Sequence, residues 1–525
     1  MGRNNATAYN MKTIPQTKDL STVMESALEY HYYTSYDRHT LSGHSLDWAN
    51  QPNVYKTYSG IETFELPRDV RLPEESLFLL LREEIGTEDL RSLHLSDISR
   101  ILMLAYSLTA RARHPGGDFY YRSAASAGAL YPTEIYIAAR SVNDLDDGLY
   151  HYSVAQHGLV LLRKGDLNSH ITEIVPFMSS NDPTLIFFLS AVFFRSAWKY
   201  RDRSYRYDLL DTGHVAENMI LALRSLDIPF TLSYDFNDHK ANRLLGLDEQ
   251  REVSLAVVSI EGRNDSNGES VYEISELPDE MKDASQVARV EKVYPVIQEI
   301  HRAGYRLDST ERSEEYMIHD LGVKPNEWER IDLPETWPEN IDFTESVFAR
   351  RSRRNFVRER ISKDHAQTLL NSLLTMDSKM IHALERHRPI AIGMLSGDVE
   401  GFVPGFSLLA HSTKSIGMIS KGHFLDKMAH ICLDQQWLAN AAFHFLFLAD
   451  LEGLDRQWGA RGYRYAMMEA GRLGERLYLM ATAMGLGCCG IGAFFDGEAA
   501  ELLGINKKSR LLYLVSVGPV KGGLH

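Results

Sequence analysis

The pair Lys199-Tyr200 has the side-chain types that proton transfer requires. Arg201 and Arg203 follow it closely, so the local potential should be positive. In such surroundings the pKa of a tyrosine hydroxyl is lowered, or a lysine amine can itself act as a base. The alternative is a basic first helical turn that packs on another part of the protein. The residues alone leave both interpretations open.

The run 350–354 places four arginines around one serine. A guanidinium group can bind two phosphate oxygens at once, so Arg350, Ser352 and Arg354 are candidate ligands for an anionic phosphate. A solvated basic surface is an equally good interpretation of the run taken alone.

Two runs of small residues could let the backbone approach a flat ligand closely. The first, Ser126-Ala127-Gly128, precedes an expected strand at 135–140, and a tight turn is the structural alternative. The second, within 485–495, contains Gly490, Ile491, Gly492 and Ala493 and follows a helix. Because it does not open a helix after a strand, it is not a dinucleotide-binding fingerprint. The adjacent cysteines 488 and 489 lack metal-ligand spacing, so no metal site is predicted.

The chain repeats itself at an offset of 258 residues. Two copies are too few for a solenoid, so the repeat predicts a duplicated α+β domain, a covalent pseudo-dimer. We expect an irregular N-terminal arm (1–70), a first domain (71–262), a linker or insert (263–342) and a second domain (343–525). Residues that coincide without a gap include Arg203 with Arg461, Tyr205 with Tyr463, Arg206 with Arg464, Gly213 with Gly471, Glu217 with Glu475, and Leu244-Leu245-Gly246 with Leu502-Leu503-Gly504.

Hydrophobic periodicity predicts the main elements of the first domain. Helices are expected at 74–84, 98–108 and 208–226, and strands at 135–140, 158–163, 185–194 and 254–260. A further helix is expected at 287–302, within the linker.

Composition excludes several classes of function. The net charge of −15 argues against a nucleic-acid binder, which would carry a basic face. The longest apolar runs are about half of what a membrane span needs. Three cysteines in 525 residues fit a reducing compartment. We therefore expect a cytoplasmic protein that binds neither nucleic acid nor membrane.

Together these motifs resemble the SagB-type or McbC-like azoline dehydrogenases, a branch of the FMN-dependent nitroreductase superfamily. The run Ser126–Pro132 is the most specific mark, and the arm at 45–58 is similar to the start of these proteins. The resemblance covers about residues 25–262 strongly and 343–520 more weakly. It implies two paired α+β domains with FMN in their interface.

The resemblance also implies roles for individual residues. Arg350, Ser352 and Arg354 would bind the phosphate and ribityl chain, and residues 490–493 would face the flavin ring. Ser126, Ala127 and Gly128 would come from the partner domain. Lys199 and Tyr200 would be catalytic, either of them serving as the base.

Each copy retains a different half of this site, so one chain is expected to build one FMN site between its own domains. The same halves could instead meet between two chains, and both a monomer and a homodimer are compatible with the sequence. The implied reaction is oxidation of thiazoline or oxazoline rings to azoles in a ribosomal peptide or related natural product. A cyclodehydratase-type enzyme is a possible partner. The alternatives are an NAD(P)H-dependent reductase of enones, dehydroamino acids or nitro compounds, and a non-catalytic peptide-binding subunit.

Overall fold

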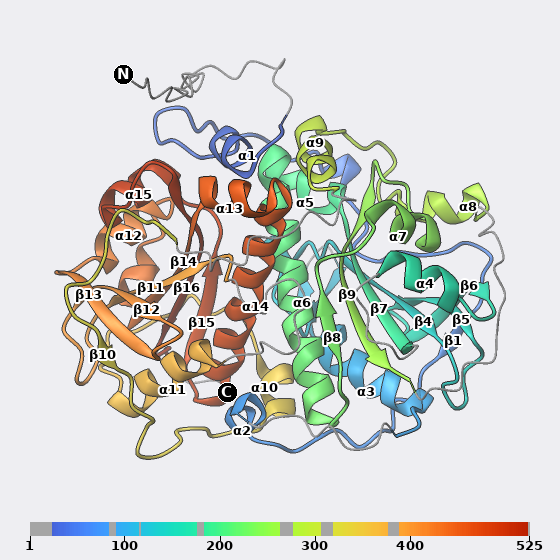
Figure 1. Ribbon diagram of the computed structural model, residues 1–525, viewed down its shortest axis with the longest axis horizontal. Helices are drawn as coiled ribbons and strands as arrows, with labels where there is room; N and C mark the ends of the chain where they lie inside the picture. Colours follow the sequence, from blue (N-terminus) through green and yellow to red (C-terminus); the bar gives the residue numbers. More distant parts are fainter. Residues whose placement is uncertain are drawn as a thin grey trace, which may run out of the picture.

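The computed structural model describes residues 24–82, 91–114, 117–175, 183–262, 277–305, 319–375 and 388–522. The start of the expected arm (1–23) and parts of the expected linker (263–276 and 306–318) lie outside these residues. Figure 1 shows two sheets, one on each side of a pair of long central helices.

The two sheets have the same topology. Each has seven strands, in the order β1-β6-β5-β4-β7-β9-β8 and β10-β13-β12-β11-β14-β16-β15, and the pairings within them are antiparallel. Below, the first half means the chain up to the end of β9, and the second half means the chain from β10 onward. The strands of the first sheet are β1 (Thr63–Glu65), β4 (Thr133–Ala139), β5 (Gly148–Ser153), β6 (Gly158–Lys164), β7 (Pro183–Val192), β8 (Thr231–Ser233) and β9 (Glu252–Glu261). Those of the second are β10 (Glu329–Arg330), β11 (Ala391–Ser396), β12 (Gly405–Ala410), β13 (Ser415–Lys421), β14 (Phe443–Asp450), β15 (Gly487–Ile491) and β16 (Ser509–Gly518).

Helices surround both sheets, and a hairpin of β2 (Leu108–His114) and β3 (Gly117–Arg122) is added in the first half. The helices are α1 (Ala27–Tyr33), α2 (Leu77–Arg82), α3 (Leu95–Tyr106), α4 (Asn168–Ile174), α5 (Phe193–Tyr200), α6 (Ser204–Ser225), α7 (Asp238–Leu245), α8 (Asp279–Lys282), α9 (Pro295–Ala303), α10 (Phe343–Ala349), α11 (Lys363–Leu374), α12 (Leu425–Ile431), α13 (Leu451–Trp458), α14 (Arg461–Ala483) and α15 (Asp496–Leu503).

Local sequence explains where several elements begin and end. The repeated Leu-Leu-Gly motif is a helix end: Gly246 and Gly504 follow α7 and α15 with φ of +67° and +65°, a conformation that suits glycine. The helix expected at 287–302 begins only at Pro295, because proline favours the first turn and disfavours helix in the residue before it. The expected strand at 185–194 ends at Val192, where α5 begins.

The long helices α6 and α14 lie against each other between the sheets (Figure 1). The repeat-related Gly213 and Gly471 lie at this contact. A Cβ added to Gly471 would lie 2.2 Å from the carbonyl oxygen of Leu210, and one on Gly213 equally close to that of Met468. The two glycines therefore allow the helices of the two halves to pack backbone against backbone.

A buried ion-pair cluster joins the second half to the first. Asp496, at the start of α15, binds Arg203 at 2.8 Å and Arg206 at 2.7 Å. His31 of α1 lies 3.1 Å from the same carboxylate. Burial raises the pKa of Asp496, but the two guanidiniums outweigh it and hold that pKa well below its usual range.

The equivalent cluster forms on the other side of the pseudo-dimer. Asp238, at the start of α7, binds Arg461 at 2.5 Å and Arg464 at 2.6 Å. His301 of α9 faces Arg464 at 3.4 Å, as His31 faces Arg206. Thus α1 and α9, from the expected arm and the expected linker, occupy equivalent places in the pseudo-dimer.

Among the helices that the structure describes, none is both long and apolar enough to cross a membrane.

Candidate active site between the two halves

The predicted catalytic pair lies at the end of α5, where the chain turns into α6. Arg201 follows with a φ of +51°, which ends the helix and leaves Lys199 and Tyr200 partly exposed. The small-residue turn of the same half lies against them. A Cβ added to Gly128 would be 2.7 Å from Tyr200 Oη and 3.0 Å from Lys199 Nζ. The structure therefore brings the Lys-Tyr pair and this turn together.

Asp211 of α6 holds this turn in place. Ser126 Oγ donates to Asp211 Oδ2 at 2.6 Å, and the Ala127 amide donates to the same carboxylate at 3.1 Å. Ser126 Oγ in turn accepts from the Tyr131 amide at 2.9 Å. Gly128 has a φ of +65°. These bonds define a tight turn, the structural alternative considered for this run, at a position facing the catalytic pair.

The arginine-serine run of the second half reaches the same junction. Arg350 is buried, and its guanidinium donates to the carbonyls of Ser123 (2.6 Å) and Arg122 (3.0 Å), directly before the turn. Arg350 therefore links the two halves. It does so with N–H donors that binding of a phosphate would require. Ser352 and Arg354 are exposed.

The glycine run is an edge strand, not a loop: β15 covers Gly487–Ile491. The Gly490 amide donates to Tyr478 Oη at 2.7 Å, and that oxygen also bonds Ser352 Oγ at 2.9 Å. A Cβ on Gly490 would lie 1.8 Å from Tyr513 Oη. Glycine is therefore required here by contacts within the protein.

The rest of the run continues toward the catalytic pair. A Cβ on Gly492 would lie 2.5 Å from the Tyr207 ring, whose centroid is 4.4 Å from that of Tyr200. Ile491 is buried in the core of the second half, while Ala493 stays partly exposed.

The electrostatics of the pair favour one of its members as a base. Burial, and then the Arg354 guanidinium, lower the pKa of Lys199. Burial raises the pKa of the Tyr200 hydroxyl far above its usual value. Arg203, expected to keep the local potential positive, instead binds Asp496, so Arg354 of the other half supplies this charge. At neutral pH the tyrosine is a proton donor, and the lysine loses its proton more easily than a free amine.

The pseudo-symmetric position has different chemistry. The residues equivalent to Gly490 and Gly492 are Leu232 and Tyr234, both fully buried. Glu217 there binds Arg472 at 2.9 Å and Arg476 at 2.6 Å. Large side chains thus stand here where the Lys-Tyr junction has glycines, whose Cβ positions are taken by Tyr513 and Tyr207.

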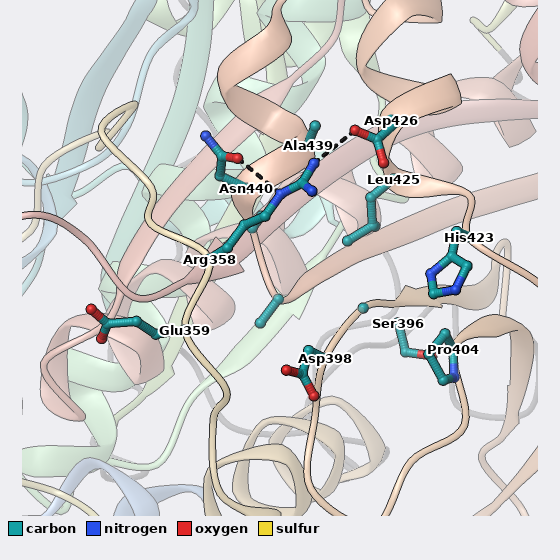
Figure 2. A pocket seen from close by; sticks show the side chains of 13 residues that line it. Arg358, Glu359, Ser396, Asp398, Pro404, His423, Leu425, Asp426, Ala439 and Asn440 are labelled. Atoms are coloured by element: carbon teal, nitrogen blue, oxygen red, sulfur yellow. Dashed lines mark hydrogen bonds and ion pairs between the residues drawn. The ribbon is translucent and has the colours of Figure 1, made fainter.

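A separate cavity of about 410 Å³ lies within the second half, away from this junction. Figure 2 shows its charged lining, in which Arg358 bonds Asp426 at 2.7 Å and Asn440 at 3.1 Å. None of the residues expected to bind or catalyse lines it.

The chain belongs to the nitroreductase family. The model of that family matches residues 89–263 and again 406–519. A crystal structure that bears the name nitroreductase, from Anabaena variabilis, aligns with 95% of this chain and 100% of its own, at a TM-score of 0.73 and 27% identity. The duplicated α+β fold expected from the sequence is confirmed.

Two curated relatives are peptide-processing proteins by name. The chain is 24% identical over 230 residues to the trifolitoxin-processing protein TfxB of Rhizobium leguminosarum bv. trifolii, which is 42% of this chain and 62% of TfxB. It is 25% identical over 184 residues to the microcin B17-processing protein McbC of Escherichia coli, which is 33% of this chain and 64% of McbC. The chain spans less than two thirds of the length of the curated relatives it matches. The expected McbC-like branch is confirmed.

Sequence reasoning missed Asp211, Tyr478 and Tyr513, which hold the turn and β15 in place. Asp211 carried a signal, because its repeat partner is the acidic Glu469 and a carboxylate recurs there. The two tyrosines carried none, since neither has a tyrosine at the repeat-related position.

Proposed function

We propose that this protein is an FMN-dependent dehydrogenase that oxidises thiazoline or oxazoline rings to azoles in a ribosomally made peptide or a related natural product. The observation that carries the proposal is the junction of Lys199 and Tyr200 with Gly128 of their own half and Arg354 of the other. A peptide substrate agrees with the names of the two processing relatives. A cyclodehydratase-type enzyme, which forms the azoline, would be the natural partner.

The residues at the junction fit FMN. Ser352 and Arg354 are exposed beside it and offer a hydroxyl and a guanidinium to the phosphate and ribityl chain. Ser123 Oγ, fully buried beside Arg350, has no hydrogen-bond partner among the described residues. The turn at 126–128 and the partly exposed Gly490, Gly492 and Ala493 would present backbone to the ring, with Tyr513 and Tyr207 filling the side-chain positions of the two glycines. When bound, the flavin would accept the hydride.

The side chains of the pair would handle the proton. Aromatisation of the ring removes one proton from Cα and one hydride, so the enzyme needs a base near the substrate. We assign this role to Lys199, because its pKa is lowered and that of Tyr200 is raised. Tyr200 would orient the ring by donating its hydroxyl proton in a hydrogen bond.

The test is substitution of the pair. We expect Lys199→Ala and Tyr200→Phe to abolish oxidation of a synthetic peptide that contains one thiazoline, with the flavin still bound. The matched control is Gln457→Ala, since Gln457 is the repeat counterpart of Lys199. Full activity in both Lys199 and Tyr200 variants would remove the assignment.

Counting released flavin tests the site itself. We expect about one FMN per chain, because Leu232 and Tyr234 fill the equivalent position. Two per chain would contradict a single composite site. Rapid flavin reduction by NADPH without azoline oxidation would identify the reductase alternative. A protein that takes up no FMN would identify a peptide-binding subunit.

A further inference from the structure

Asp211 is a buried carboxylate that the chemistry described so far does not use. It lies on α6 and is 5% exposed. Ser126 Oγ and the Ala127 amide both donate to it, at 2.6 and 3.1 Å. It is thus the acceptor that fixes two consecutive residues of the small-residue turn.

The next residue of that turn determines the space around the catalytic pair. Gly128 is so close to Tyr200 Oη and Lys199 Nζ that even a methyl group would reach them at 2.7 and 3.0 Å. A movement of the turn by a few tenths of an ångström therefore changes the room that both side chains have. The position of the turn depends on its hydrogen bonds to Asp211.

We propose that Asp211 is a positioning residue: its ionised carboxylate holds the turn at 126–128 and thereby places Lys199 and Tyr200 for reaction. The catalytic consequence rests on the proposed function, whereas the link between Asp211 and the turn rests on hydrogen-bond geometry. The other half offers a contrast. The repeat counterpart Glu469 is bound by Arg472 at 2.9 Å, in the half that lacks the Lys-Tyr pair.

The carboxylate changes its charge in the range where the enzyme would work. Burial raises the pKa of Asp211 to about 7, and it outweighs Ser126, His214 and the Ala127 amide, which lower that pKa. The titratable groups that face it are Asp208 and His214 of α6, Tyr106 of α3, Tyr200 of α5, Glu475 of α14 and Tyr513 of β16.

Protonation would disturb the turn for a simple reason. Ser126 Oγ already accepts from the Tyr131 amide, and its own hydrogen points to Asp211 Oδ2. A proton on that oxygen would place two hydrogens between the same two atoms, so the serine hydroxyl would have to rotate away. The ionised form is therefore the one that matches the observed bonds.

The first measurement is the pH dependence of kcat with the thiazoline peptide. Below about pH 7, wild-type kcat should fall more steeply than protonation of the Lys199 base alone requires, because Asp211 takes up a second proton. Asp211→Asn should lose this additional steepness, keep the pH dependence that Lys199 causes, and lower kcat by about 10- to 100-fold at about pH 8, with flavin content unchanged. Ser126→Ala cuts the same link from the other side and should act in the same direction. Glu469→Gln, the matched control, should keep the wild-type profile.

The second measurement does not depend on catalysis. The pKa of Asp211 is higher in the folded protein than in the unfolded chain, so the folded state loses stability as the pH rises toward that pKa. Asn at this position does not titrate and should therefore raise the melting temperature relative to wild type. The difference should grow from about pH 4 to about pH 7 and then level off. An Asp211→Asn enzyme with the wild-type pH limb overturns the proposal, as does a melting difference independent of pH. Wild-type protein that oxidises no azoline but shows the melting difference would remove the proposed function and leave Asp211 a buried, titrating support of the turn.

Discussion

Replacing Gly128 by alanine should separate folding from catalysis at this site. The residue has a φ of +65°, so alanine should cost about 1–2 kcal/mol of backbone strain. The new Cβ would lie 2.7 Å from Tyr200 Oη, about 0.7 Å closer than ordinary contact. Both Tyr200 Oη and Lys199 Nζ end flexible side chains, so they would move aside and the protein would still fold. A displacement of this size at reacting groups can lower kcat by up to about 100-fold.

Gly504 provides the matched control for this substitution. Its φ is also +65°, but the nearest atom to an added Cβ is Val323 Cγ1, at 3.9 Å. Gly504→Ala should therefore show the strain without the displacement. We expect similar losses in the free energy of unfolding for both variants, measured with denaturant, and a loss of azoline oxidation in Gly128→Ala alone. Equal activity in the two variants would refute the placement of the pair against the turn.

Two further predictions concern charge. Asp496→Ala and Asp238→Ala each leave two buried arginines without their carboxylate, so each should lower the free energy of unfolding by about 3–5 kcal/mol near neutral pH. The depressed pKa of Asp496 means that its contribution is present above about pH 4 and lost below it, and a loss under about 1 kcal/mol in denaturant unfolding would contradict the role of these clusters. Arg354→Gln removes a positive charge that lowers the pKa of Lys199, so the rise of kcat with pH should move to higher pH in a steady-state profile. An unchanged profile would show that Lys199 is not the base.

Much of the fold could be predicted because the two copies can be aligned with each other in the sequence. The offset of 258 residues that aligns Gly213 with Gly471 also aligns Asp238 with Asp496. Gly213 and Gly471 lie where the two long helices pack together, and Asp238 and Asp496 are the acceptors of the two ion-pair clusters. Sequence identity alone cannot show that each aspartate binds the arginines of the opposite half, because that depends on how the halves dock.

The expected arm and linker were harder to interpret for a physical reason. Helices α1 and α9 are short, and their repeat relation has a different offset, 270 residues, seen in His31 and His301. Each contacts both halves: His31 bonds Tyr463 and faces Arg206, and His301 bonds Tyr205 and faces Arg464. Local periodicity carries no information on contacts of this kind. The support that Asp211 gives to the turn lies within the first half, but it joins residues 85 apart in the sequence, which periodicity does not show either.

The duplication also allows the two halves to differ at their equivalent positions. The paired clusters of Asp238 and Asp496 hold the halves together in addition to Arg350, so the interface does not depend on the proposed ligand site alone. One such difference is Tyr234, which stands where the other half keeps Gly492 and fills that position with a fully buried side chain. In a homodimer of identical chains the same change would fill both sites at once. A covalent pseudo-dimer can therefore give one half the Lys-Tyr pair and the other the Arg-Ser run, and retain a single junction where both are present.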